Sequence, residues 1–361
     1  MLKLHHQGYL YGPAKKPMLT PRGLCFDGHH LLISDTGQNR IFIYEGWPGA
    51  GHHEPALVLG QSSLEATDRN AGSGPSASSL HYPSGIWSDG KRLAVADAWN
   101  HRVLLWNQFP IQSQQPADVV LGQEDFSRME VNRKGPGAPP SAETLYWPYG
   151  LTSDGAQLWI ADTGNRRILH FAQWPDTNGA PADGILGQPD FQSRDYDPDF
   201  PVWPYSVKIG PEGGMLVADT QYYRVLYWPQ WREAMIGRSA VLLGQPDFGT
   251  NGMNQYGLFP DAHTLNWVYD ADFGPGAGLT VADTGNSRLL HFAQLPQHHS
   301  PAAHTVIGQP DFKTGSENPE TVQTTAHSLY WPFALQCSDT QLWVADTGNH
   351  RVGLYACYPE T

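Results

Sequence analysis

The sequence predicts a single all-β domain, a six-bladed β-propeller, and three observations lead to this prediction. A phrase made of an apolar run, Asp and, five residues later, Arg occurs six times in the 361 residues. A Leu-Gly-Gln phrase, with Ile in place of Leu in the fifth unit, follows five of these six Asp residues at a constant distance. Each unit holds short apolar runs separated by turn residues, which is typical of four antiparallel strands per blade.

The Asp and Arg residues mark the turn between the second and third strands of each blade. Successive Asp residues lie 57 to 65 positions apart, and four of the turns read Asp-Thr-Gly. We expect Asp to accept backbone N–H groups, Gly to supply a positive φ, and Arg to return to the Asp or to a neighbouring blade. A charged functional site is the alternative, but a residue type present in every blade is expected to serve the blade. The pairs are Asp35/Arg40, Asp97/Arg102, Asp162/Arg167, Asp219/Arg224, Asp283/Arg288 and Asp346/Arg351.

The Leu-Gly-Gln phrase marks the outer strand and its exit. Three copies continue as Pro-Asp-Phe, whose Asp we interpret as a turn residue, with a bound ion as the alternative. In the third unit the four predicted strands are 150–153, 158–161, 168–171 and 184–186, each rich in β-branched, aromatic or other apolar residues. The phrase ends at Gln61, Gln123, Gln188, Gln245 and Gln309.

The two ends of the chain predict how the ring closes. After Arg351 only one more apolar run, 352–357, remains, so the sixth unit lacks a fourth strand. Residues 8–13 resemble the missing phrase, and we expect the N-terminal strand to complete blade six and so remove an exposed sheet edge. The predicted blades are 19–61, 81–123, 146–188, 202–245, 266–309, and 330–357 together with 4–12.

The phrase Val-Ala-Asp-Thr-Gly-Asn-His-Arg-Val at 344–352 resembles the core of the NHL repeat, and the five other copies carry it with variation. The Gln-Pro-Asp-Phe extension resembles bacterial NHL proteins with enlarged repeats, so the resemblance covers nearly the whole chain. It implies a six-bladed propeller and mostly binding or scaffolding roles. A few relatives with this architecture are enzymes: peptidyl-hydroxyglycine lyases, lactonases, strictosidine-synthase-like proteins and streptogramin lyases.

The composition limits the classes of partner that we expect this protein to bind. The formal net charge of −13 disfavours nucleic acid, because an acidic protein repels phosphate backbones. No segment has the roughly 20 consecutive apolar residues of a membrane span, and no signal peptide is evident. Three widely spaced cysteines predict free thiols in a reducing compartment. We therefore expect a soluble, cytoplasmic monomer whose partner is a protein or a small molecule.

An aromatic residue precedes the innermost strand in five of the six units. We expect these rings to surround one mouth of the central channel, under the loops that join the blades, and to bind a ligand by stacking or around a cation. Packing between adjacent blades is the alternative interpretation. The residues are Tyr82, Trp147, Trp203, Trp267 and Trp331, with Thr20 in the remaining unit.

Departures from the repeat supply the other candidates. Arg22, Asn266 and Asp270 stand where other units carry different residues, and three histidines, His81, His263 and His327, lie just before inner strands. These histidines could hold a divalent metal at the central channel or exchange protons, or each could only cap its own loop. No other cofactor is evident. The sequence thus predicts a binding or scaffold propeller with a loop-decorated, aromatic-rimmed face, and a metal-assisted lyase or lactonase-like enzyme is the alternative.

Overall fold

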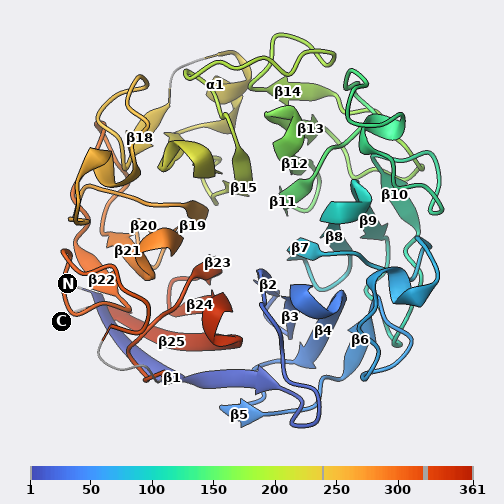
Figure 1. Ribbon diagram of the computed structural model, residues 1–361, viewed down its shortest axis with the longest axis horizontal. Helices are drawn as coiled ribbons and strands as arrows, with labels where there is room; N and C mark the ends of the chain where they lie inside the picture. Colours follow the sequence, from blue (N-terminus) through green and yellow to red (C-terminus); the bar gives the residue numbers. More distant parts are fainter. Residues whose placement is uncertain (1, 238–239, 320–323, 360–361) are drawn as a thin grey trace.

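The computed structural model describes residues 2–237, 240–319 and 324–359, whose strands form six sheets around a central axis (Figure 1). In every blade the first strand lies nearest the axis and the later strands follow outwards by antiparallel pairing. The predicted six-bladed β-propeller is therefore confirmed. The described residues contain one short α-helix, α1 (Trp231–Met235), and none of their helices is long and apolar enough to cross a membrane.

The strands of blades one to three follow one plan, and those of blade three match the four predicted runs closely. Blade one holds β2 (Gly23–Phe26), β3 (His30–Asp35), β4 (Arg40–Glu45) and β6 (Leu57–Leu59). Blade two holds β7 (Pro83–Ser88), β8 (Leu93–Asp97), β9 (Arg102–Trp106) and β10 (Val119–Leu121). Blade three holds β11 (Pro148–Ser153), β12 (Leu158–Asp162), β13 (Arg167–Phe171) and β14 (Gly184–Leu186).

The other three blades repeat this pattern. Blade four holds β15 (Pro204–Ile209), β16 (Met215–Asp219), β17 (Arg224–Trp228) and β18 (Val241–Leu243). Blade five holds β19 (Val268–Phe273), β20 (Leu279–Asp283), β21 (Arg288–Phe292) and β22 (Thr305–Ile307). Blade six holds β23 (Pro332–Cys337), β24 (Gln341–Asp346) and β25 (Arg351–Pro359).

Short 3₁₀ helices form the turns and parts of the loops. In each blade one of them joins the second strand to the third: η1 (Thr36–Gln38), η3 (Ala98–Asn100), η5 (Thr163–Asn165), η6 (Thr220–Tyr222), η8 (Thr284–Asn286) and η9 (Thr347–Asn349). Three more lie in the loops between blades: η2 (Arg69–Gly72), η4 (Val131–Arg133) and η7 (Met253–Tyr256).

The N-terminal strand β1 (Leu2–Gly12) closes the ring. It pairs antiparallel with β25, in a register that runs from Leu2 opposite Pro359 to Leu10 opposite Val352. The two-residue strand β5 (Gly51–His52) pairs with the end of β1, so blade six has five strands. The two termini consequently lie side by side (Figure 1).

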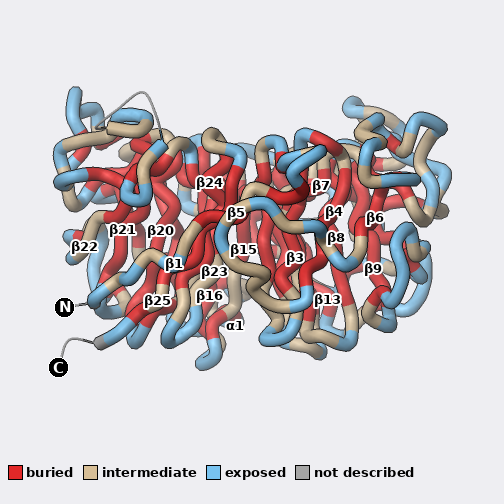
Figure 2. Tube along the Cα trace, turned by 90° about the horizontal axis from the view of Figure 1, so that it is seen from below, coloured by how far each residue is buried: buried red, intermediate tan, exposed pale blue. Residues whose placement is uncertain are grey.

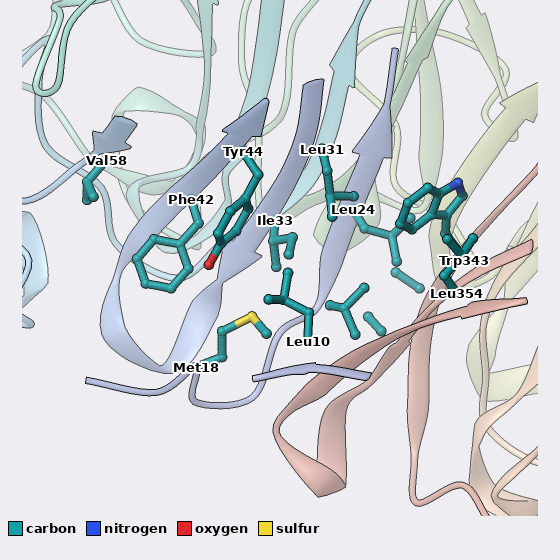
Figure 3. Close-up of a cluster of buried hydrophobic side chains, with 13 residues drawn as sticks. Leu10, Met18, Leu24, Leu31, Ile33, Phe42, Tyr44, Val58, Trp343 and Leu354 are labelled. Carbon is teal, nitrogen blue, oxygen red and sulfur yellow. The ribbon is translucent and has the colours of Figure 1, made fainter. Parts of the chain in front are cut away.

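The hydrophobic core is divided among the seams between neighbouring blades. Six clusters of buried apolar side chains each join residues of two adjacent blades. The cluster between blades six and one includes Leu10 of β1, Phe42 of β4 and Trp343 of β24 (Figure 3). Figure 2 shows that the strands are buried, whereas exposure concentrates in the loops at the two ends.

Buried ion pairs hold the turns, as predicted for the Asp and Arg residues. In all six blades the Arg Nε lies 2.6–2.9 Å from an oxygen of its Asp, and both side chains are buried. Arg167 also donates to the carbonyls of Ser141, Thr144 and Phe191, which belong to the loops on either side of its blade. The interpretation of these charges as architecture is confirmed.

The predicted reason for the turn glycine is wrong. The positive φ falls on the residue just before Arg, for example Asn39 at 55° and His101 at 52°. Gly164 is needed for space instead, because a Cβ there would lie 2.5 Å from the ring of Tyr146. A side chain at this position must therefore displace its surroundings, which matters in blade two.

Candidate functional site

Blade two departs from the repeat at its turn, which reads Asp-Ala-Trp at 97–99. In the other five blades a threonine follows Asp, and its hydroxyl donates to a carbonyl of the next blade, as Thr163 does to Pro204 at 2.5 Å. Ala98 has no hydroxyl for this bond. Trp99 then occupies the position of the turn glycine, and its N–H lies 3.2 Å from the His81 carbonyl.

The Trp99 side chain is held between blades with one surface open. Its indole stacks on Tyr82 at 4.5 Å between ring centroids and an interplanar angle of 11°. His81 meets it edge-on at 5.2 Å, and the hydroxyl of Tyr149 also interacts with it. Trp99 nevertheless remains 44% exposed. These contacts fix the orientation of the ring, so its free surface is a preorganised stacking platform.

A cavity of about 710 Å³ opens at this platform. Its walls come from the loops that join blade one to two and blade two to three, and its size lies within the roughly 300–1,000 Å³ usual for small-molecule sites. The side chains that matter for the chemistry are Asp68, Arg69, His81, Trp99, Met129 and Glu130.

Two histidines of the cavity are neutral at pH 7. Burial lowers the pKa of His81, so its imidazole can donate one hydrogen bond and accept another. Burial lowers the pKa of His101 further, to about 4. The Nδ1 atom of His101 accepts the N–H of Trp147 from blade three at 3.1 Å, which assigns this histidine a structural role.

Aromatic rings and one arginine fill the channel on the axis. The residues that follow the repeated proline, or Val268 in blade five, line it, among them Arg22, Tyr149, Tyr205, Tyr269 and Phe333. Tyr149 stacks on Tyr205 at 4.6 Å, and Tyr269 lies 4.0 Å from Phe333. The Arg22 guanidinium lies 3.9 Å above the Phe333 ring. The channel is thus plugged rather than open.

The five aromatics singled out from the sequence are placed differently from one another. Tyr82 contacts both Arg22 and Trp99 and so joins the channel to the cavity. Trp147 and Trp203 contact each other across the seam of blades three and four at 6.2 Å. Trp267 packs against Tyr223, while Trp331 is 43% exposed. Their common role around one ligand stays a prediction, and none of the four tryptophans lines the channel or the cavity described above.

Asp270 and Arg22 both line the channel, but the oxygens of Asp270 are already engaged. They accept the N–H of Ala271 and of Leu335, each at 3.0 Å, and one lies 3.9 Å from the Lys208 ammonium. Asp272 likewise accepts the N–H of Cys337 at 2.9 Å, and burial raises the pKa of Asp272 to about 6. These carboxylates join blades four, five and six.

The structure does not bring the remaining candidates together. His263 is exposed and donates to the Ser300 carbonyl at 2.8 Å, His327 is exposed in another loop, and His81 lies at the Trp99 cavity. Within residues 2–237, 240–319 and 324–359, no three His, Cys, Asp or Glu side chains are grouped so that they could hold a metal. Asn266 donates its N–H to Asp283 at 2.6 Å, like the equivalent residue of other blades.

Sequence reasoning missed Trp99, Tyr149, Tyr205 and Phe333. The signal for Trp99 was present, because its turn and that of blade four are the two that do not read Asp-Thr-Gly. The channel residues stand directly after the aromatic-Pro phrase, one position beyond the proline.

The blades and the plugged channel place the chain among six-bladed β-propeller proteins. Neither a family model nor a curated protein matches its sequence. It is similar to the solved structure of a streptogramin B lyase at 10% identity, over 99% of this chain and 98% of that one, with a TM-score of 0.50. It is also similar to Kuenenia stuttgartiensis hydrazine synthase at 11% identity, over 93% and 95% of the two chains, with a TM-score of 0.51. At these identities the likeness shows the fold alone.

Proposed function

We propose that this protein is a binding propeller that holds a small ligand in the cavity at Trp99. The observation that carries the proposal is the coincidence of the cavity with the turn where blade two abandons the repeat. Replacing a glycine by tryptophan at this turn does not help the blade, since in the four turns that have the glycine a Cβ would lie 2.5–2.6 Å from a neighbouring side chain. Such a local departure is expected where a residue serves recognition instead of folding.

The lining indicates the kind of ligand. The free surface of Trp99 offers stacking to a flat ring, and Met129 adds a flexible apolar contact. Asp68, Arg69, Glu130 and the neutral His81 offer hydrogen bonds at the edge of such a ring. A planar heterocycle with polar substituents satisfies both sets of groups. The resemblance of the repeats to the NHL type, whose members mostly bind or scaffold, supports a binding role.

The alternative, a metal-assisted lyase or lactonase-like activity, requires His81, His263 and His327 at one ion. The placement of these histidines in separate loops favours binding over that activity. Elemental analysis of the purified protein tests the alternative directly, and one equivalent of a divalent metal that is lost on substitution of His81 would support it.

Trp99 can be observed separately from the other tryptophans. We would label the protein with 5-fluorotryptophan, assign the Trp99 resonance with Trp99→Phe, and titrate with indole, nicotinamide and adenine as planar probes. The Trp99 resonance should shift with at least one probe. Trp99→Ala should weaken that probe about tenfold, or 1.4 kcal/mol, because the stacking surface is lost.

Trp331→Ala is the matched control, because Trp331 is as exposed as Trp99 yet does not line the cavity. This variant should bind the probe unchanged, and both variants should keep the urea midpoint of the parent within error. The proposal fails if no probe moves the Trp99 resonance, or if Trp331→Ala weakens binding as much as Trp99→Ala.

A further inference from the structure

The channel holds one cation without a carboxylate partner. Each of the six turn arginines is paired with its Asp, and Lys208 lies beside Asp270. Arg22 has no ion pair among the described residues; its guanidinium lies over the rings of Phe333 and Tyr82 and interacts with the Tyr205 hydroxyl. Burial disfavours its charged form, but the phenols around it, chiefly that of Tyr205, outweigh this and raise the pKa of Arg22. The guanidinium is therefore charged.

Three polar atoms without a hydrogen-bond partner belong to residues that line the same space. They are Arg22 Nε, Ser84 Oγ and Tyr205 Oη. Ser84 is 1% exposed and Tyr205 6%, so water outside the protein does not reach them freely. A buried polar group left unpaired costs about 1–3 kcal/mol, and a charged one costs more. The three groups together call for one acceptor.

The chemistry of the donors defines that acceptor. A guanidinium N–H can only donate, and both hydroxyls can donate as well, so the acceptor needs no hydrogen of its own. The space open to the centre of a water-sized sphere measures about 30 Å³, above the roughly 10–15 Å³ that one water molecule needs, so a small ion fits there. A phosphate or sulfate carries close to two negative charges, whereas the site supplies a single guanidinium. A single halide ion matches both the size and the charge of the site.

We propose that the channel binds one chloride-sized anion, held by Arg22 Nε, Ser84 Oγ and Tyr205 Oη. The two residues that make the site possible are departures from the repeat, since blade one has Arg22 and blade two has Ser84 where the other four blades carry aromatic rings. The bound anion would compensate the only unpaired cation of the channel and fix the aromatic plug on the axis. This site shares no lining residue with the Trp99 cavity, and Tyr82 lies between the two.

Bromide is the probe for the site, because it replaces chloride and scatters anomalously. Crystals grown in sodium bromide should show one anomalous peak among the three donor atoms. In solution, the thermal midpoint should rise by about 2 °C between sodium gluconate and sodium bromide, both at about 0.2 M, because an anion that binds only the folded state stabilises it.

Arg22→Met should abolish both the anomalous peak and the bromide-dependent rise, and Ser84→Ala, which keeps the charge, should weaken the rise. Arg92→Met is the control, because Arg92 is paired with Asp89 outside the channel and its loss should leave the rise intact. Water in place of bromide in the crystals, or an equal rise in Arg22→Met and the parent, would overturn the proposal.

Discussion

At the scale of single residues, chemically different side chains perform one task at the positive-φ position of the turn. In four of the six blades this side chain accepts a backbone N–H from the segment that leads into the inner strand of the next blade. Asn39 accepts from Tyr82 at 2.9 Å, and His101 accepts from Trp147 at 3.1 Å. Ser287 and His350 play the same part for Trp331 and Thr20. A histidine that attracts attention in the sequence can thus be a hydrogen-bond acceptor of the framework.

This role makes the stability of the protein depend on the protonation of His101. The unfolded chain takes up a proton near pH 6.5, whereas the folded pKa of His101 is about 4, so stability is lost as the pH falls between these values. We expect His101→Asn, which copies the residue of blade one, to keep the hydrogen bond and remove this titration. We would measure the free energy of unfolding by urea at pH 7 and at pH 4.5. The decrease between the two pH values should be smaller by about 2 kcal/mol in the variant than in the parent.

The exposed His263 provides the control for that measurement. His263→Asn removes a histidine without removing a buried acceptor, so its loss of stability between the two pH values should equal that of the parent. An unchanged pH dependence in His101→Asn would show that another group governs the response.

At the scale of elements, the turn between the second and third strands also connects its blade to the next one through a hydrogen bond. Its threonine hydroxyl reaches the next blade at five seams, and blade two, with Ala98, lacks this bond at the seam to blade three. The Trp99 cavity opens at the same place. The proposed ligand site and the missing hydrogen bond between blades therefore lie in one turn, because both follow from replacing its residues.

Restoring the missing hydrogen bond between blades two and three should stabilise the protein. Ala98→Thr should recover a bond to the Pro148 carbonyl and raise the free energy of unfolding by about 1 kcal/mol. The reverse change in blade three, Thr163→Ala, should lower it by a similar amount, because its bond to Pro204 is lost. Urea denaturation of both variants measures these changes, and destabilisation by Ala98→Thr would mean that the neighbouring Trp99 has reshaped the turn.

Strand geometry explains why the sequence predicts the fold better than the site. The repeated phrases place all four strands of blade three, and the observed bounds differ by at most two residues from the predicted ones. The residues that face the channel follow no simple alternation, because the pairing register shifts between Pro148 and Gly150 and at the same place in blades four, five and six. Tyr149 lies in such a shift, so counting from the proline could not assign it to the channel.

At the scale of the whole molecule, the ring depends on contacts between residues that are far apart in the chain. The seam of blades six and one is packed by Leu10 of β1 together with Ile33 of β3 and Trp343 of β24 (Figure 3). Next to it, Tyr9 and Tyr355 share a hydrogen bond of 2.9 Å, and the Arg351 guanidinium lies 3.4 Å above the Tyr9 ring. Strand β1 therefore supplies both a sheet edge and a part of the core.

Removing residues 1–12 should consequently open the ring. The deletion exposes the edge of β25 and removes the buried side chains of Tyr9 and Leu10. A buried Leu→Ala change alone costs about 2–5 kcal/mol. The free energy of unfolding lost by the whole deletion therefore approaches the total stability of a typical domain. We expect the truncated chain to aggregate or unfold at low urea, as measured by light scattering and circular dichroism.

A synthetic peptide of residues 1–12 should restore folding by pairing with β25. The same peptide with Leu10→Asp should not, because it would bury a charge in the seam. A truncated chain that stays monomeric with the parent midpoint would show that blade six is stable without its outer strand.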